Sequence, residues 1–532
     1  MPGFAGKLHS PFSIFHSLLF YYIPGIPQTQ FGKALVSIKG NKRIIRWAAL
    51  GLGAYIGLLV LLRALETGRG GGIDTLADAL WYSLVTMTTV GYGDKFPVTF
   101  GGRLVGTVFM LISTGLLALF IGVALSMLTG RLFPRLRLWR HRRERWYVFS
   151  SDNPAARALA SKLEDGLVLF CGSTVGLTPE ALLELPMSAK GERVCFAMDE
   201  DPMANERLAV ALKDVPATVY CREDGLNEGL PGNIIPFSEA ECAARLYWHA
   251  RPWRPSGERA VLIGDGRYAR ALLLQGLLTA PPDCAIDAFG DWSLWEAIHS
   301  ALNDVPDRRF TLRFHAEPWP SQAELLRTAD RVVLCGDAAG ENRETLCLLR
   351  QYFVLHGQVD VRCSAGLQSA FYFGEDSQIF TPELVMRQSQ SRRARGLHEL
   401  YRSSVDYPVP PWEALSDFLK RSNLAAADHL LTKLRLLLPE ADIRELTPEA
   451  CARAADAYAA LDPEGIERCR RIEHSRWALF HALYNWRYAP VRDNPERRHH
   501  LLVPYEQLSQ EEREKDDNAW LQLRLLAERG IV

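Results

Sequence analysis

Residues 88–94 read Thr88-Thr89-Val90-Gly91-Tyr92-Gly93-Asp94, and this stretch is the strongest indication of the fold around it. Glycine alternates in it with larger residues, which lets the backbone adopt angles that aim successive carbonyl oxygens toward one axis. The preceding residues 74–87 have an acidic start and the apolar spacing of a helix. The stretch is therefore either a glycine-rich turn or a specialised loop presented by a short helix.

Two apolar segments flank this loop. Residues 104–130 contain no charge over 27 positions, and Arg103 and Arg131 bracket them. At about 1.5 Å per residue, such a helix is about 40 Å long, enough to cross a hydrocarbon core of about 30 Å. A second apolar segment covers residues 44–62. We predict two membrane-spanning helices joined by the glycine-containing loop.

Basic residues concentrate on the outer flanks of the two segments. Five precede the first segment, namely Lys33, Lys39, Lys42, Arg43 and Arg46. Seven arginines lie within residues 131–145, whereas the loop between the segments carries Arg69 and Lys95. The positive-inside rule then places both termini in the cytoplasm of a multi-pass inner-membrane protein. An arginine cluster also suits nucleic acid, but its position directly after a span favours lipid headgroups of the bilayer.

The loop with its flanks resembles the pore unit of two-span potassium channels. The resemblance covers about residues 40–133, and the Thr-Val-Gly-Tyr-Gly selectivity filter stands intact as residues 89–93. It implies that carbonyls from four chains replace the water shell of potassium ions in the pore, and hence that the chain forms a homotetramer. The Thr89 hydroxyl would add a further ring of oxygens.

The same resemblance assigns a gating hinge to Gly115 in the second span, with Gly122 as the rival position. A single glycine in a membrane helix also serves as a packing site, so both roles stay open. No arginine-repeat segment precedes the pore, and a dedicated voltage sensor is not expected.

Composition bounds the rest of the chain. With 532 residues, the expectation is three to four domains. The balance of 61 Lys and Arg against 62 Asp and Glu excludes a strongly basic nucleic-acid-binding protein and an acidic disordered chain. All ten cysteines lie between Cys171 and Cys469 without a CxxC pair, so no metal site is predicted.

From Arg145 onward, strand-like and helical segments alternate, which predicts parallel α/β domains. Residues 146–149, 167–170 and 193–198 are expected as strands of a first domain. A second domain is expected to begin with a strand at 259–263, followed by a helix to about residue 278, a strand at 284–289 and a later strand at 331–335.

The second domain carries a dinucleotide-binding fingerprint between its first strand and helix. Gly264, Gly266 and Ala269 fit the pattern GxGxx(G/A) in a strand–turn–helix setting. The acidic partner is either Asp287, inside the next strand, or Asp291, just past it. The candidate nucleotide-binding residues are Gly264, Asp265, Gly266, Arg267, Asp287 and Asp291. A purely structural role for this turn remains the alternative.

Two Rossmann-like units after a potassium pore resemble the cytoplasmic domains that regulate potassium conductance. The resemblance is architectural and covers about residues 146–375. It implies a gating ring around a four-fold axis, in which ligand binding changes the ring diameter and pulls on the inner helices. The Arg-rich linker would transmit that pull.

The C-terminal part resembles the ryanodine-receptor (RyR) repeat domain over about residues 405–525. The resemblance rests on ordered motifs such as Glu473-His474-Ser475-Arg476-Trp477 and Asn485-Trp486-Arg487-Tyr488. Arg476, Trp477, Trp486 and Tyr488 are expected to clamp a planar, anionic ligand by stacking and charge. The candidate ligand-binding residues are Glu473, His474, Arg476, Trp477, Trp486, Tyr488, Asp493 and Tyr505. Alternatively, these residues only stabilise the packing of the helices or bind a partner protein.

The predicted fold class is a membrane α-helical pore unit, with two spans and a pore helix, followed by two α/β Rossmann-like domains and a mostly α-helical C-terminal domain. The expected divisions are an N-terminal cytoplasmic or interfacial segment (1–39), the pore domain (40–133), the Arg-rich linker (134–145), the first (146–255) and second (256–376) Rossmann-like domains, a connector (377–404) and the RyR-like domain (405–532).

These features predict a homotetrameric potassium channel gated by a cytoplasmic small molecule, with a nucleotide as the expected ligand. No nucleophile–base constellation or P-loop stands out, so an enzyme is not expected. One alternative is a potassium-conducting effector of a nucleotide-messenger signalling or defence system. Another is a membrane-anchored nucleotide-processing enzyme with a vestigial pore, against which the intact filter argues.

Overall fold

The computed structural model divides the chain into two compact units, residues 1–135 and 136–532. The structure describes residues 42–127, 138, 140–171, 178–183, 191–223, 230–364, 366, 369–405, 407–441 and 443–530. The predicted N-terminal segment, 1–39, and residues 134–137 and 139 of the predicted linker lie outside the described residues.

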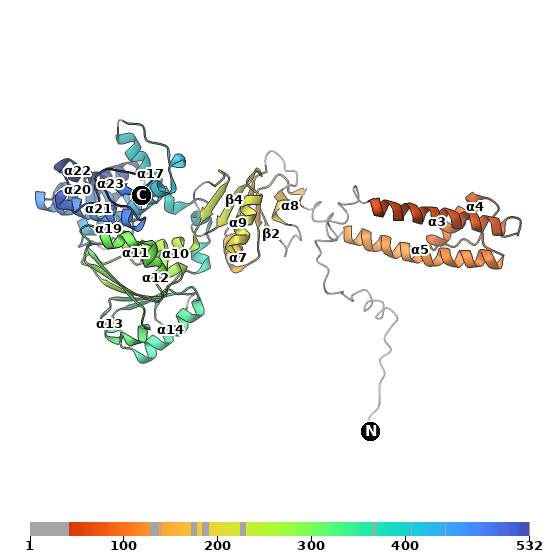
Figure 1. Cartoon of the computed structure of the whole chain (residues 1–532), viewed down its shortest axis with the longest axis horizontal. Helices are drawn as coiled ribbons and strands as arrows, with labels where there is room; N and C mark the ends of the chain where they lie inside the picture. The colour runs from red at the N-terminus through yellow and green to blue at the C-terminus, as the bar shows by residue number, and fades with distance from the viewer. Residues whose placement is uncertain are drawn as a thin grey trace, which may run out of the picture. The chain divides into compact units, whose positions relative to one another are not determined.

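Among the residues that the structure describes, the first unit contains three helices. They are α3 (Lys42–Glu66), α4 (Leu76–Met87) and α5 (Phe100–Met127). Figure 1 shows α3 and α5 side by side, with α4 against one end of the pair. Thr75 caps α4 by accepting from the Asp78 amide, and the Asp78 side chain accepts from the Thr75 amide. This capping box confirms the short helix predicted before the glycine-containing loop. Over the described part of the chain, no helix combines the length and the apolarity required to cross a membrane.

A buried carboxylate ties the end of α3 to the start of α5. Glu66 accepts from the amides of Val98, at 2.8 Å, and Thr99, at 2.9 Å, and from the Thr99 hydroxyl. A Cβ atom on Gly102 would collide with this carboxylate, so the residue must be glycine. Val98 and Thr99 directly precede Phe100, so these bonds fix the chain where it enters α5.

The second unit begins with a five-stranded parallel sheet in the order β2-β1-β3-β4-β5. Its strands are β1 (Trp146–Phe149), β2 (Leu167–Phe170), β3 (Arg193–Ala197), β4 (Thr218–Arg222) and β5 (Ile234–Phe237). Its helices are α7 (Pro154–Ala160), α8 (Pro179–Leu183) and α9 (Pro202–Ala211). The three predicted strands are confirmed, and the alternation of strands with helices accounts for the parallel pairing.

The second sheet is parallel in the order β11-β10-β9-β6-β7-β8. Its strands are β6 (Arg259–Ile263), β7 (Cys284–Phe289), β8 (Phe310–His315), β9 (Arg331–Leu334), β10 (Gln358–Arg362) and β11 (Phe371–Phe373). Its helices are α10 (Glu239–Ala250), α11 (Arg267–Thr279), α12 (Ser293–Ile298), α13 (Ala323–Thr328) and α14 (Ala339–Tyr352). This is the strand order of dinucleotide-binding folds, with the reversal between β6 and β9.

The C-terminal part is helical, as predicted. Its elements are α15 (Asp376–Ile379), α16 (Pro382–Val385), α17 (Ser389–Ser404), α18 (Asp417–Asp428), α19 (Leu430–Leu437), α20 (Pro448–Ala459), α21 (Pro463–Leu483), α22 (Gln510–Lys515), α23 (Asn518–Arg529) and the short pair β12 (Arg487–Tyr488) and β13 (Arg498–His499). The connector, for which a helix remained open, is largely helical because α17 occupies its second half.

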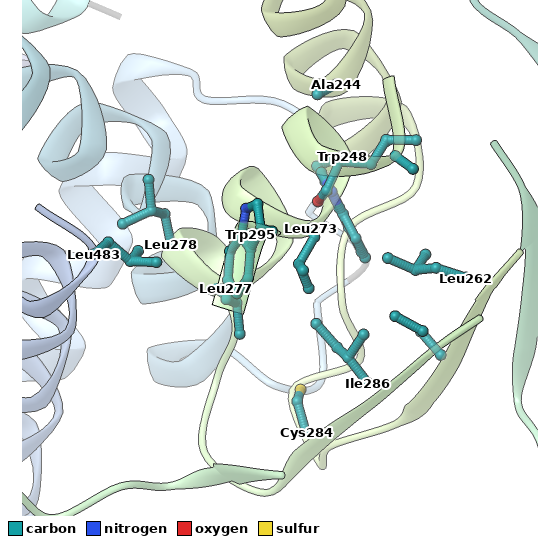
Figure 2. Close-up of a cluster of buried hydrophobic side chains, with 14 of the residues drawn as sticks. Ala244, Trp248, Leu262, Leu273, Leu277, Leu278, Cys284, Ile286, Trp295 and Leu483 are labelled. Atoms are coloured by element: carbon teal, nitrogen blue, oxygen red, sulfur yellow. The ribbon is translucent and has the colours of Figure 1, made fainter. Parts of the chain in front are cut away.

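The helical C-terminal domain and the second Rossmann-like domain share one hydrophobic core. Figure 2 shows Leu278 of α11 beside Leu483 of α21, with Trp295 of α12 close by. All three side chains are buried, at 5% exposed or less. The His299 ring also hydrogen-bonds the Leu483 carbonyl at 2.7 Å. The two domains therefore form a single packed body along α11.

Replacing Leu483 with alanine is expected to loosen this shared core. Deleting a buried leucine side chain costs about 2–5 kcal/mol, because it removes contacts and leaves a cavity. The matched control is Leu521→Ala on α23, where the leucine is 54% exposed and the change is expected to stay within about 0.5 kcal/mol. Denaturant titration of both variants checks this, and equal losses of stability would contradict the shared core.

Candidate functional sites

The backbone of the glycine-containing loop alternates between two kinds of conformation. Thr89, Gly91 and Gly93 have φ angles of 61°, 61° and 72°, whereas Val90 and Tyr92 do not have positive φ. The left-handed region costs a non-glycine residue about 1–2 kcal/mol, which Thr89 bears in this loop. This alternation turns successive carbonyls toward the same side, as a carbonyl-lined ion pathway requires.

The end of α4 holds the loop in place. The amides of Val90 and Gly91 both donate to the Val85 carbonyl, at 3.1 and 3.3 Å. The Thr88 hydroxyl donates to the Leu84 carbonyl at 2.8 Å, so it closes the last turn of α4. These bonds use carbonyls of the last turn of α4, and the Leu84 carbonyl also accepts from the Thr88 amide at 2.9 Å.

Side chains fix the other end of the loop. The Trp81 indole donates to the Asp94 carboxylate at 2.9 Å, and its ring is stacked on Tyr92 with 6.1 Å between centroids. Lys95 pairs with Asp78 at 2.6 Å and donates to the Gly72 carbonyl at 2.8 Å. The loop is thus anchored to α4 at both ends, while its backbone spans the interval between the anchors.

Apolar surface around this loop is open in the single chain. Val90 is 53% exposed, Tyr92 is 68% exposed and Phe100 is 87% exposed. Large apolar patches on a protein mark surfaces that another molecule covers. This surface is therefore a candidate for contact with another molecule.

Gly115, the predicted hinge, lies within α5. The helix runs without a break through Gly115 and Gly122, and a Cβ atom on either would meet no atom within 4 Å. Within the described chain, neither glycine is used for close packing. The hinge at Gly115 stays a prediction.

The fingerprint turn of the second Rossmann-like domain lies where its strand order reverses. Gly264 has a φ angle of 134°, and a Cβ atom there would lie 2.7 Å from the Gly336 amide nitrogen. Gly266 is the N-cap of α11. The glycines thus have the conformational and packing roles that the fingerprint predicts.

A carboxylate of the chain itself occupies the helix N-terminus at this turn. Asp337, just after β9, accepts from the amides of Arg267 and Tyr268, each at 3.2 Å. In dinucleotide-binding proteins the pyrophosphate sits at this helix N-terminus. A nucleotide bound in that way must displace Asp337. The sequence reasoning missed Asp337, although its position after a strand at the reversal point was a usable signal.

The two acidic residues proposed to contact a ribose, Asp287 and Asp291, form hydrogen bonds within the domain. Asp287 lies inside β7, is buried, and contacts the His315 ring at 2.8 Å. Asp291 caps Ser293, and its amide donates to the Asp265 carboxylate at 2.7 Å. Of the two, Asp291 lies beyond the strand end, where a ribose contact would be made. Asp287 has a structural partner instead.

Replacing Asp337 with alanine is expected to strengthen binding of a dinucleotide such as NAD by tenfold or more. The change frees two helix amides and removes a like charge from the path of the phosphates, and each charge-assisted bond contributes about 1.5–3 kcal/mol. Isothermal titration of the full chain measures this. Asp214→Ala, which removes an exposed charge elsewhere, is the control, and an unchanged affinity in Asp337→Ala would contradict this interpretation.

In the C-terminal domain, Glu473 lies in a buried cluster of charges on α21. Its carboxylate contacts Lys433 at 2.9 Å and Arg476 at 2.6 Å. These two cations hold the pKa of Glu473 well below its usual range, despite its burial. Burial raises the pKa of the nearby Asp516 to about 8, and the Glu473 charge adds to that shift. Burial also lowers the pKa of Lys433. One carboxylate, that of Glu473, is thus shared by two buried basic side chains.

The four side chains expected to clamp one ligand do not line one cavity. Trp486 and Tyr488 line a pocket of about 260 Å³ with residues of the second Rossmann-like domain. Arg476 lines a separate cavity. Trp477 packs instead among histidines, with its ring centroid 4.1 Å from that of His481. The predicted single clamp is wrong because Arg476 and Trp477 lie on α21, whereas Trp486 and Tyr488 follow it and line a different pocket.

The remaining candidates connect chain segments. His474 hydrogen-bonds the Val503 carbonyl at 3.0 Å, and Asp493 accepts from the Glu496 amide in a turn. The Tyr505 amide donates to the Asp307 carboxylate at 2.6 Å, which joins the C-terminal domain to the second Rossmann-like domain. Across the described residues, no group of three or more His, Cys, Asp or Glu is placed to hold a metal ion.

Buried histidines make the C-terminal domain sensitive to acid. Burial lowers the pKa of His429 and of His481 to about 3, and that of His499 to about 4. Below the ordinary value of about 6.5, the unfolded chain binds protons that the folded chain does not. Stability is therefore greatest above pH 6.5 and falls as the pH drops toward these lowered values.

We expect each such histidine to cost about 1.4 kcal/mol of unfolding free energy per pH unit below about pH 6. His481→Gln is expected to flatten this dependence, as measured by thermal unfolding between pH 7.5 and 5.5. His356→Gln, at an exposed position, is the control and leaves the slope unchanged. Equal slopes in all three proteins would contradict the burial effect.

Two parts of the chain match known families. Residues 50–130 match the family described as an ion channel, and residues 464–530 match the RyR domain. Neither description names an enzymatic activity. The matches confirm the predicted ion-channel and RyR domains.

Curated relatives resemble the pore region. Human potassium voltage-gated channel subfamily KQT member 3 is 50% identical over 50 residues, which is 9% of this chain and 6% of that protein. Mouse potassium voltage-gated channel subfamily A member 6 is 37% identical over 76 residues, 14% of each chain. The chain thus spans only a small part of the length of these relatives.

Among solved structures, GsuK bound to ADP aligns over 74% of this chain and 98% of its own, with 14% identity and a TM-score of 0.28. The GsuK channel bound to NAD aligns over 75% of this chain and 84% of its own, with 11% identity and a TM-score of 0.27.

Proposed function

We propose that this chain, which contains an ion-channel domain and a RyR domain, is one subunit of a homotetrameric potassium channel gated by a cytoplasmic small-molecule ligand. The observation that carries the proposal is the alternating backbone of residues 89–93. A potassium ion that enters a narrow pore must exchange its water shell for other oxygens, and aligned carbonyls supply them.

The open apolar surface around the filter supports a tetramer. One chain supplies one row of carbonyl oxygens, whereas a ring of oxygens around an ion needs such a row from each of several chains. Val90, Tyr92 and Phe100 lose their exposed surface when copies of the unit surround a common axis. Irregular backbone such as this loop is tolerated at membrane depth only when protein buries it or it lines a pore.

The membrane location rests on the sequence around the filter. Residues 104–130 carry no charge, and basic residues cluster on the outer side of both apolar segments. We place both termini in the cytoplasm on this basis. The second unit is then cytoplasmic and accessible to soluble ligands.

The route from ligand to pore runs through the second unit. The RyR domain shares a core with the second Rossmann-like domain, so a ligand that shifts one domain also moves the other. The chain continues from α5 into β1 through the Arg-rich linker. We infer that movement of the cytoplasmic unit is transmitted along this connection to the hinge at Gly115.

Potassium flux into liposomes containing the purified full chain tests the function. We expect flux that is selective for potassium over sodium and that changes when single nucleotides are added. Gly91→Ala is expected to reduce flux at least tenfold, because alanine is strained at a φ angle of 61° and four copies meet in one filter.

The matched control is Gly340→Ala, at a helical position where a Cβ atom meets no atom within 4 Å. It is expected to conduct as the wild-type chain does. Size-exclusion chromatography establishes that both variants assemble. Flux that is absent from the wild-type chain under every condition, or that is unchanged in Gly91→Ala, would overturn the proposed function.

A further inference from the structure

A small cavity lies between the second Rossmann-like domain and the RyR domain. Its walls include Arg308 and Arg309, from the loop before β8, and Arg476, from α21. His429, which follows α18, also lines it. We call this space the arginine cavity, defined by Arg308, Arg309, Arg476 and His429. Sequence reasoning had no means of pairing these residues, because they come from different domains.

Two buried nitrogen atoms at the arginine cavity have no hydrogen-bond partner. Arg476 is 8% exposed, and while its Nε and Nη2 atoms donate to Glu473, its Nη1 atom has no acceptor. His429 is 1% exposed, and its Nδ1 atom is also unpartnered. Because burial lowers the pKa of His429 to about 3, its ring is neutral near pH 7, and the unsatisfied charged donor is Nη1 of Arg476. A buried, unsatisfied donor on a charged group costs several kcal/mol, so this atom calls for a ligand or water.

The charges at the arginine cavity do not balance. Arg308 and Arg309 form no ion pair with any residue that the structure describes; Arg308 lies over the Phe310 ring instead. Among the lining residues, the single carboxylate is that of Asp307, which accepts from the Tyr505 amide. Partial burial lowers the pKa of both Arg308 and Arg309, which reflects the cost of holding these charges away from water. Three guanidinium groups thus face one carboxylate.

The charges behind the cavity wall reduce this excess of positive charge without removing it. Asp283 and Glu506 also act on Arg309, but Glu506 is paired with Arg471. Glu473 is shared between Arg476 and Lys433, so one carboxylate serves two buried cations. Bringing like charges together away from water is unfavourable unless an opposite charge is added. The missing charge is therefore negative, and its place is beside Arg476.

The size of the cavity indicates which kind of anion it takes. Its volume is about 40 Å³, room for about three water molecules, which suits a single phosphate group and excludes a nucleoside. The pocket of Trp486 and Tyr488 shares Val305 as a wall with the arginine cavity. A planar group attached to the phosphate would have that larger pocket next to it. Arginine binds phosphate through paired N–H donors.

We propose that the arginine cavity binds the phosphate group of a small anionic ligand and thereby clamps the RyR domain to the second Rossmann-like domain. Binding would give Nη1 of Arg476 its acceptor and neutralise Arg308 and Arg309 across the domain boundary. The binding stands on its own contacts, whereas its effect on the pore rests on the proposed function.

Isothermal titration of the full chain tests the site with three probes, namely inorganic phosphate, ADP and adenosine. We expect ADP to bind, inorganic phosphate to bind and to compete with ADP, and adenosine to bind at least tenfold more weakly than ADP. Adenosine binding as tightly as ADP would overturn the assignment of a phosphate site, as would the absence of binding by both phosphate compounds.

Variants locate the binding. Arg309→Gln and Arg476→Gln are each expected to weaken ADP and phosphate at least tenfold. Because Arg476 is buried and paired with Glu473, Arg309→Gln, at a partly exposed position, gives the answer if Arg476→Gln fails to fold. Arg343→Gln, which removes an exposed charge on α14, is the matched control and keeps wild-type affinity. Equal affinities in Arg309→Gln and the wild-type chain would overturn the proposal.

Flux measurements separate this inference from the proposed function. If ADP binds at the arginine cavity but does not change potassium flux, the binding site is supported and the proposed gating by this ligand is overturned. If ADP alters flux equally in the wild-type chain and in Arg309→Gln, the channel function stands and the arginine cavity does not gate the pore. The titrations of the same variant then decide whether the cavity binds ADP.

Discussion

Helix α11 is the element on which the cytoplasmic unit depends. Its N-terminus follows the fingerprint turn and holds the Asp337 carboxylate, and its C-terminal half packs against α21 in the core shared with the RyR domain. The apolar side chains of α11 would be exposed on either side without these neighbours, so its burial requires both domains at once. The fingerprint turn, the shared core and the arginine cavity are all positioned by this one helix.

Buried charge imposes a second constraint. Within the RyR domain, Glu473 stabilises Arg476 and Lys433 together, and the structure leaves part of Arg476 without a partner. At the fingerprint turn, by contrast, the donors have a partner within the chain, because Asp337 accepts from the first amides of α11. One anion-binding position is thus filled by the chain, and the other has the unmet charge. Both places attract negative charge. A ligand at the fingerprint turn must displace Asp337, whereas an anion at the arginine cavity meets a donor that has no partner.

Sequence reasoning succeeded where the signal is local. The helix before the glycine-containing loop, three strands of each sheet and the strand–turn–helix around Gly264 follow from consecutive residues and their spacing. It failed for the clamp of Arg476, Trp477, Trp486 and Tyr488, because the first two lie on α21 and the other two follow it, and the fold places them at different cavities. It also passed over Asp337, whose role appears only when the end of β9 lies beside the start of α11.

The sequence by itself determined much of the backbone of residues 89–93, since Gly91 and Gly93 favour left-handed positions residue by residue and need no distant partner. It also determined the succession of domains, through charge-free stretches and strand–helix alternation. The tertiary structure alone decided which anion sites are filled and which are open. Arg309 and Arg476 lie far apart in the chain and have no sequence pattern in common. Only the burial of α11 against α21 brings their charges into one cavity.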